Sequence, residues 1–169
     1  MVSYIVRAAT ESDTQAILDL IVELADYEKM ADQVRLRVEQ LKCSGFRADG
    51  EPWFHAKVAA IVDPCGECDI VGYSIYFFKH DILSNSRSVY MEDLYVKPAY
   101  RNRGIGVALW RSVAAHGVQE KCSSLRFAVL SWNEPSIKFY KSQGASDITT
   151  TRGVRAYRLK LSQPDQSSS

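Results

Sequence analysis

The chain has 169 residues, about the length of one compact domain, and its 46% hydrophobic and 24% charged residues are ordinary for a globular protein, which excludes wholesale disorder. Residues 1–100 hold ten Lys and Arg against sixteen Asp and Glu, whereas residues 101–169 hold eleven against four, so a chain-wide basic surface for nucleic acid is not supported. No apolar run approaches the roughly 18 residues of a membrane span, and the first residues lack the layout of a secretory signal, so we expect a cytoplasmic protein with no membrane partner.

The first part of the chain predicts a strand, two helices and three further strands. Thr10 and Asp13 have the spacing of a capping box that opens the first helix, and Gly45 follows the second. Runs rich in β-branched and aromatic residues, separated by turn residues, predict consecutive antiparallel strands. The predicted strands cover residues 4–8, 53–62, 70–78 and 88–96, and the predicted helices begin at residue 10 and cover residues 34–42.

The rest of the chain predicts an alternation of helices and strands. An apolar helical pattern runs to residue 118, and a strand is expected over 125–131. Asn133 is expected to cap a further helix that Gly144 ends. A last strand is expected over residues 154–161, so that one domain covers residues 1–161 and a polar tail covers 162–169.

The most informative segment is Arg-Asn-Arg-Gly-Ile-Gly at residues 101–106, between a predicted strand and a predicted helix. A helix start exposes backbone N–H groups and the positive end of the helix dipole, and glycines allow a phosphate to approach. Arg101 and Arg103 add positive charge, so the turn suits a pyrophosphate. Val107 and Ala108 stand where a P-loop carries Lys and Ser or Thr, and the three-glycine pattern of a Rossmann turn is incomplete. By its residues alone, an ordinary helix-start turn remains the alternative.

Cysteine and histidine do not indicate a metal site. Cys65 and Cys68 have the spacing of half a zinc site, but the three histidines of the chain are scattered singly. Four cysteines in a chain of this length do not form a disulfide framework. We therefore predict no metal, and an ordinary turn around Gly66.

Arg101, Gly104 and Gly106 match the signature Arg/Gln-x-x-Gly-x-Gly/Ala of the GNAT superfamily of N-acetyltransferases, which the chain resembles. Within that superfamily it is similar to the branch that contains the spermidine/spermine (diamine) and thialysine acetyltransferases. The similar blocks are residues 24–28, 53–55, 90–96, 100–106, 132–140 and 144–147, and the resemblance extends from about residue 5 to about residue 161.

This resemblance implies a GNAT acyl-CoA N-acyltransferase fold, which is an α/β (α+β) fold with a mixed, mostly antiparallel central sheet flanked by helices. It also implies acetyl-CoA as co-substrate and a homodimer. In this similarity the strand residues face the thioester and pantetheine, the turn holds the pyrophosphate, and two later residues contact the cofactor from the other side. The implied cofactor-binding residues are Leu94, Tyr95, Val96, Arg101, Asn102, Arg103, Gly104, Ile105, Gly106, Asn133 and Ser136.

The chemistry of acetyl transfer assigns two catalytic roles. A primary amine has a pKa near ~10.4 and must lose a proton before it attacks, and Glu92 is the candidate base. Backbone N–H groups near Leu94 and Tyr95 would stabilise the oxyanion if the strand bulges there. Tyr140, within the similar block 132–140, is the candidate acid for the leaving thiolate. No Cys-His or Ser-His-Asp arrangement is evident, so direct transfer in a ternary complex is expected.

Tyr27, Glu28, Glu92 and Asp93 are predicted to bind a small cationic primary amine. The similar polyamine enzymes carry further acidic residues and a tryptophan at positions that here are Gln33, Ile82, Arg152 and Val154. The loss of carboxylates favours thialysine or a lysine-like amino acid over spermidine or spermine. A polyamine acetyltransferase, a non-catalytic acyl-CoA-binding sensor and an enzyme that acetylates protein amino groups remain alternatives.

Overall fold

The structure is a computed structural model that describes residues 3–62, 68–82 and 85–153. The chain divides into two compact units, Met1–Ala128 and Val129–Ser169, and each is described by itself. Within the described ranges, no helix is long and apolar enough to cross a membrane.

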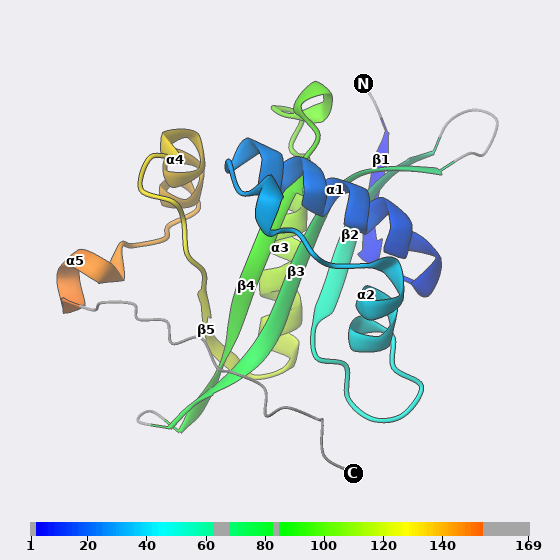
Figure 1. Ribbon diagram of the computed structural model, residues 1–169. Coiled ribbons are helices and arrows are strands. Elements are labelled where there is room, and N and C mark those ends of the chain that lie inside the picture. Colours follow the sequence, from blue (N-terminus) through cyan, green and yellow to red (C-terminus); the bar gives the residue numbers. More distant parts are fainter. Residues whose placement is uncertain (1–2, 63–67, 83–84, 154–169) are drawn as a thin grey trace, which may run out of the picture. The chain divides into compact units, whose positions relative to one another are not determined.

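The described part of the first unit contains a five-stranded sheet whose strands lie in sequence order (Figure 1). The first four strands are antiparallel to their neighbours and the fifth runs parallel to the fourth, which confirms a mixed, mostly antiparallel sheet. The strands are β1 (Tyr4–Ala8), β2 (His55–Val62), β3 (Cys68–Asp81), β4 (Ser86–Val96) and β5 (Cys122–Arg126). The helices are α1 (Thr14–Tyr27), α2 (Val38–Gly45) and α3 (Ile105–Gln119), with short 3-10 turns η1 (Glu11–Asp13), η2 (Ala31–Gln33) and η3 (Pro98–Tyr100).

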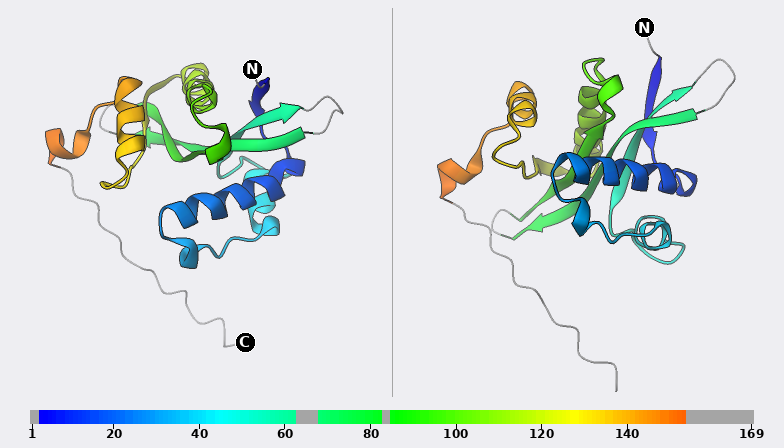
Figure 2. Two further views of the ribbon diagram at one scale, coloured as in Figure 1. Left: turned by 90° about the horizontal axis from the view of Figure 1, so that it is seen from above. Right: turned by 45° about the horizontal axis from the view of Figure 1, so that its top comes forward.

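Helices cover both faces of this sheet. α1 and α2 lie on one face and α3 lies on the other (Figure 2). On the α1 face, Ile17 and Leu20 form a buried cluster with Tyr73 of β3. On the α3 face, Leu109 clusters with Val71. The apolar stripe of each helix therefore finds a matching face of the sheet.

The start of the first helical segment is fixed by a buried carboxylate. Asp13 accepts a hydrogen bond from the backbone N–H of Thr10 at 2.7 Å, which confirms the predicted capping interaction. Arg7 of β1 donates to both oxygens of the same carboxylate, at 2.6 and 2.8 Å. The bidentate pair ties the first strand to the entry of α1.

The sheet loses its fifth strand part of the way along β4. The pairing of β4 with β5 ends at Tyr90, whereas its pairing with β3 continues to Val96. Met91 and Asp93 oppose two successive residues of β3, so Glu92 between them is the extra residue of a β-bulge. Beyond the bulge, no strand of the described residues pairs with the second edge of β4.

The element order predicted for the described residues is confirmed apart from α5, but several boundaries differ. The helix predicted over 34–42 begins at Val38, where the side chain of Gln40 accepts from the N–H of Arg37 at 3.0 Å, and it includes Gly45, which was wrongly predicted to follow it. The strand predicted over 125–131 is β5, which begins three residues earlier and ends at Arg126, because its extent is set by pairing with β4. A sequence pattern does not reveal a distant strand partner.

The described part of the second unit contains two helices, α4 (Glu134–Ser142) and α5 (Ile148–Arg152). The side chain of Asn133 accepts from the N–H of Ser136 at 3.3 Å, and Gly144 adopts a positive φ of 88° just after α4. The predicted cap and stop of this helix are therefore confirmed. α5 was not predicted, and the strand predicted over 154–161 lies outside the described residues.

Gly72 of β3 supports the open part of β4. A Cβ atom at this position would lie 2.8 Å from the backbone oxygen of Tyr95 and 3.2 Å from Val96 Cγ2. The backbone oxygen of Tyr95 cannot move aside as a flexible side chain could. Gly72→Ala is therefore expected to lower the free energy of unfolding by about 1–3 kcal/mol. Urea denaturation measures this loss. Lys79→Ala, at an exposed position of the same strand, is the control and should stay within about 0.5 kcal/mol of wild type; equal stability of the two variants would contradict the packing argument.

Candidate active site

The loop between η3 and α3 has the backbone geometry of an anion site. Gly104 precedes the helix with a φ of 82°, a conformation that favours glycine, and Asn102 is also at a positive φ of 58°. The N–H of Ala108 reaches the oxygen of Gly104 at 2.9 Å and begins the helical pattern, so the N–H groups before it have no acceptor within the helix. Together with the helix dipole, this turn suits a pyrophosphate.

The backbone of β4 beyond the bulge lies next to this loop in the chain. The side chain of Val96 joins the cluster on the α3 face, with Leu94 packed against it, whereas Tyr95 points to the α1 face. Beyond Tyr90 the second edge of β4 has no pairing with β5; the backbone oxygen of Val96 accepts from Nε of Arg101 at 2.9 Å, and the backbone oxygen of Tyr95 lies towards Gly72 of β3. The predicted bulge is present, at Glu92, two residues before Leu94. An extended group such as a pantetheine arm could pair with this edge as a strand would.

The structure brings the acidic residues predicted to bind the acceptor close to one another. Asp93 accepts a hydrogen bond from the hydroxyl of Tyr73 at 3.0 Å. Burial raises the pKa of Asp93 to about 6, and the negative charges of Glu92 and Glu28 add to this effect, whereas the bond from Tyr73 opposes it. Burial also raises the pKa of Glu28. Glu92 and Glu28 thus both act electrostatically on Asp93, and negative charge around this carboxyl favours the binding of a cation.

Glu92 and Tyr27 are more open to solvent than Asp93. Glu92 is exposed at the bulge, as expected for a group that meets a substrate. The ring of Tyr27 is 39% exposed and lies at the end of α1, beside Glu28. The predicted pocket residues of the first unit therefore gather around the bulge and the end of α1.

The guanidinium groups of the loop face aromatic rings. The Cζ atom of Arg101 lies 5.4 Å from the ring centroids of both Tyr27 and Tyr95. The Cζ atom of Arg103 lies 5.7 Å from the ring centroid of Tyr100. The sequence alone predicted positive charge for phosphate oxygens at these two positions and gave no sign of the rings, since these belong to other elements.

Three predicted site residues belong to the second unit. Asn133 and Ser136 form the cap of α4, and Tyr140 lies in the same helix with its ring 5.1 Å from that of Phe139. Their roles towards the cofactor and the leaving group stay predictions.

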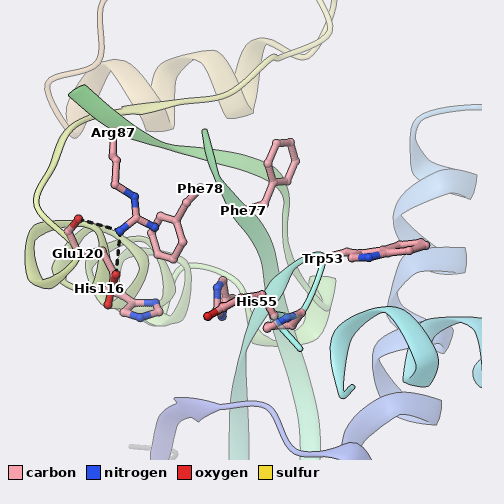
Figure 3. Close-up of a pocket in the computed structure, with 9 residues that line it drawn as sticks. Trp53, His55, Phe77, Phe78, Arg87, His116 and Glu120 are labelled. Carbon is pink, nitrogen blue, oxygen red and sulfur yellow. Dashed lines mark hydrogen bonds and ion pairs between the residues drawn. The ribbon is translucent and has the colours of Figure 1, made fainter. Parts of the chain in front are cut away.

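A pocket of about 490 Å³ that sequence reasoning missed lies on the α3 side of the first unit, near the start of β4 (Figure 3). The hydroxyl of Tyr76 and Nδ1 of His116 are 2.7 Å apart, and Arg87 bonds Glu120 at 3.0 Å. Burial lowers the pKa of both His55 and His116. The lining residues are Glu51, Pro52, Trp53, His55, Phe77, Phe78, Arg87, His116 and Glu120. The run of aromatic residues Tyr76, Phe77 and Phe78 in β3 is the signal that could have indicated it.

The described residues contain no group of three or more His, Cys, Asp or Glu side chains that could hold a metal ion. Cys68 is exposed, and Cys65 lies outside the described residues.

Comparisons with known proteins agree with this geometry. Residues 16–145 match the Acetyltransferase (GNAT) family. The chain is 41% identical to a thialysine N-epsilon-acetyltransferase of Sus scrofa, over 95% of this chain and 94% of that protein. It is 33% identical to spermidine/spermine N(1)-acetyltransferase-like protein 1 of Homo sapiens, over 91% of this chain and 22% of that longer protein. An integron cassette protein of V. cholerae shares the fold, with a TM-score of 0.73 at 23% identity over 95% of this chain and 94% of that one. The chain therefore belongs to the GNAT family of acetyltransferases.

Proposed function

We propose that this acetyltransferase moves the acetyl group of acetyl-CoA to the primary amine of a small lysine-like acceptor, with thialysine as the first candidate. The observation that carries the proposal is the cluster of Glu28, Glu92 and Asp93 beside the open edge of β4. The 41% identity to a thialysine N-epsilon-acetyltransferase supports the same acceptor. A homodimer in the cytoplasm belongs to the proposal as well.

The donor side fits acetyl-CoA through backbone groups. The turn at residues 101–106 would hold the pyrophosphate, and the main chain of Leu94 to Val96 would hold the pantetheine arm and the thioester. Asn133 and Ser136 of the second unit would contact the coenzyme from the other side. The coenzyme supplies an activated acetyl group with a thiolate as leaving group.

The acceptor side must bind an ammonium ion and then remove its proton. At neutral pH the amine arrives charged, since its pKa is near ~10.4. Asp93 and Glu28 would attract the ammonium, and Glu92, which is exposed at the bulge, would take the proton directly or through water. The nitrogen lone pair then forms the new bond to the thioester carbon.

Attack places negative charge on the former carbonyl oxygen. The N–H groups of Leu94 and Tyr95 follow the bulge and would stabilise this oxygen. Cleavage of the C–S bond releases a thiolate, to which Tyr140 would donate its phenolic proton. The acetyl group would pass directly from the bound thioester to the bound amine in a ternary complex.

A polyamine acetyltransferase is the second candidate, which the similarity to spermidine/spermine N(1)-acetyltransferase-like protein 1 supports. A long polycation needs several spaced carboxylates. Gln33, Ile82 and Arg152 stand at positions where the similar polyamine enzymes carry acidic residues or tryptophan, and Ile82 is 78% exposed. This difference favours the shorter acceptor.

The choice of acceptor is tested by thiol release from acetyl-CoA with thialysine, lysine, putrescine and spermidine. We expect kcat/KM for thialysine to exceed that for spermidine by at least about ten-fold, which corresponds to the loss of one favourable charge contact. Equal or better use of spermidine would establish the polyamine alternative. The absence of release with every amine would count against catalysis on small amines altogether.

Tyr140→Phe tests the proposed acid and separates an enzyme from a sensor. Without the phenolic proton, kcat should fall by about 10²–10⁴-fold, while acetyl-CoA binding by calorimetry stays close to wild type. Phe139→Leu, at the neighbouring position of the same helix, controls for a general disturbance of α4. An unchanged kcat in Tyr140→Phe would remove this residue from the mechanism.

The raised pKa of Asp93 predicts how acceptor binding depends on pH. Below about 6 the carboxyl is protonated and no longer attracts the ammonium, so KM for the acceptor should rise as the pH falls through about 6. Asp93→Asn should have a high acceptor KM at all pH values and lack this step. Tyr73→Phe removes a bond that favours the ionised form, so the step should move to higher pH. A step that persists in Asp93→Asn would assign it to another group.

A further inference from the structure

Arg101 connects two elements that hold different substrates in the proposed function, on which this inference rests. Its main chain belongs to the turn before α3. Its side chain turns towards the end of β4, where Nε donates to the backbone oxygen of Val96 at 2.9 Å. The guanidinium then lies 5.4 Å from the ring centroids of Tyr95, at the end of β4, and of Tyr27, the last residue of α1.

A second contact joins α1 to the end of β4. The hydroxyl of Tyr95 donates to Oε2 of Glu23 at 3.1 Å, one helical turn before Tyr27. The last turn of α1 contains no basic residue of its own. Arg101 thus brings a cation to the last residue of a helix, where the partial negative charge of the dipole favours one. The ring of Tyr95, through Arg101, and its hydroxyl, through Glu23, both take part in holding the end of α1 to the end of β4.

The held segment carries part of the acceptor pocket. Glu28 follows Tyr27 directly, and its N–H bonds the oxygen of Leu24 at 2.9 Å, so its position depends on that of the last helical turn. Its carboxylate is close enough to raise the pKa of Asp93. A shift of Tyr27 would therefore change the spacing of the carboxylates that bind the ammonium.

We infer that Arg101 is a positioning residue that couples the donor loop to the acceptor pocket by fixing Tyr27 and Glu28 against the end of β4. Phosphate bound to the loop fixes the main chain of Arg101, and the guanidinium passes this constraint to α1. The substrate that binds first orders the shared contact, which has a cost in free energy. The second substrate finds the contact already ordered, so each substrate binds more tightly when the other is present. Lysine cannot replace arginine here, since it has neither the Nε–H donor nor a planar group that stacks between two rings.

A double-mutant cycle with Arg101→Lys and Tyr27→Leu tests this coupling. Arg101→Lys keeps one positive charge in the loop but loses the bond to Val96 and the contacts with the two rings, so KM for the acceptor should rise about ten-fold, more than KM for acetyl-CoA does. Tyr27→Leu should have the same effect, and the double variant should be no worse than either single variant. An unchanged acceptor KM in Arg101→Lys, or effects that multiply in the double variant, would overturn the inference.

Arg103→Lys is the matched control in the same loop. Its guanidinium lies over Tyr100, which belongs to η3 and not to α1. Loss of this contact should alter KM for acetyl-CoA before that for the acceptor. A rise of the acceptor KM equal to that in Arg101→Lys would show that any stacked arginine of the loop matters, and would overturn the specific role of Arg101.

Hydrogen exchange tests the inference without any acceptor. In the wild type, addition of coenzyme A should slow amide exchange at Tyr27 and Glu28 several-fold, and in Arg101→Lys exchange there should be several-fold faster and insensitive to the coenzyme. If the wild-type protein acetylated none of the amines, the proposed function would be wrong. The exchange rates at Tyr27 and Glu28 would still show whether binding of the coenzyme is coupled to the end of α1. Equal exchange at Tyr27 and Glu28 in wild type and variant would refute this coupling.

Discussion

The candidate site depends on the separation of β4 from β5. A strand inside a sheet satisfies its backbone groups on both edges, but β4 loses its second partner after Tyr90 while β3 still holds it as far as Val96. The bulge at Glu92 lies at this point, where an extra residue bends the strand and re-aims its side chains. The end of the pairing with β5 and the bulge thus lie next to each other in β4, where the proposed function needs backbone groups for the donor and a carboxylate for the acceptor.

The two helical layers give the two ends of the site opposite electrostatic character. α3 begins just after Gly104, so its positive end lies at the donor loop. α1 ends at Tyr27 and delivers Glu28 to the neighbourhood of Asp93. In the proposed function, an anionic coenzyme and a cationic amine would therefore be attracted to different elements of the first unit.

Features with local causes could be predicted from the sequence, and features that need a distant partner could not. The capping of α1 by Asp13 and of α4 by Asn133 follows from residues within one helical turn. The extent of β5 and the start of α2 were placed wrongly; β5 takes its bounds from the strand beside it. Glu28, Glu92 and Asp93 were predicted as a group from the sequence, but the sequence gave no indication that the pKa of Asp93 would rise to about 6, since that depends on its burial next to Tyr73.

The sequence by itself determined the order of the elements, the glycine turn at the start of α3 and the family signature, because these rest on short-range spacing and backbone conformation. Only the tertiary structure decided where the side chain of Arg101 goes. From the sequence it is one positive charge in a turn that suits a phosphate, yet in the fold its Cζ atom lies 5.4 Å from the ring centroids of both Tyr27 and Tyr95. The partners of a long side chain are set by which elements pack together, and residue 27 reaches residue 101 only after α1 has docked on the sheet.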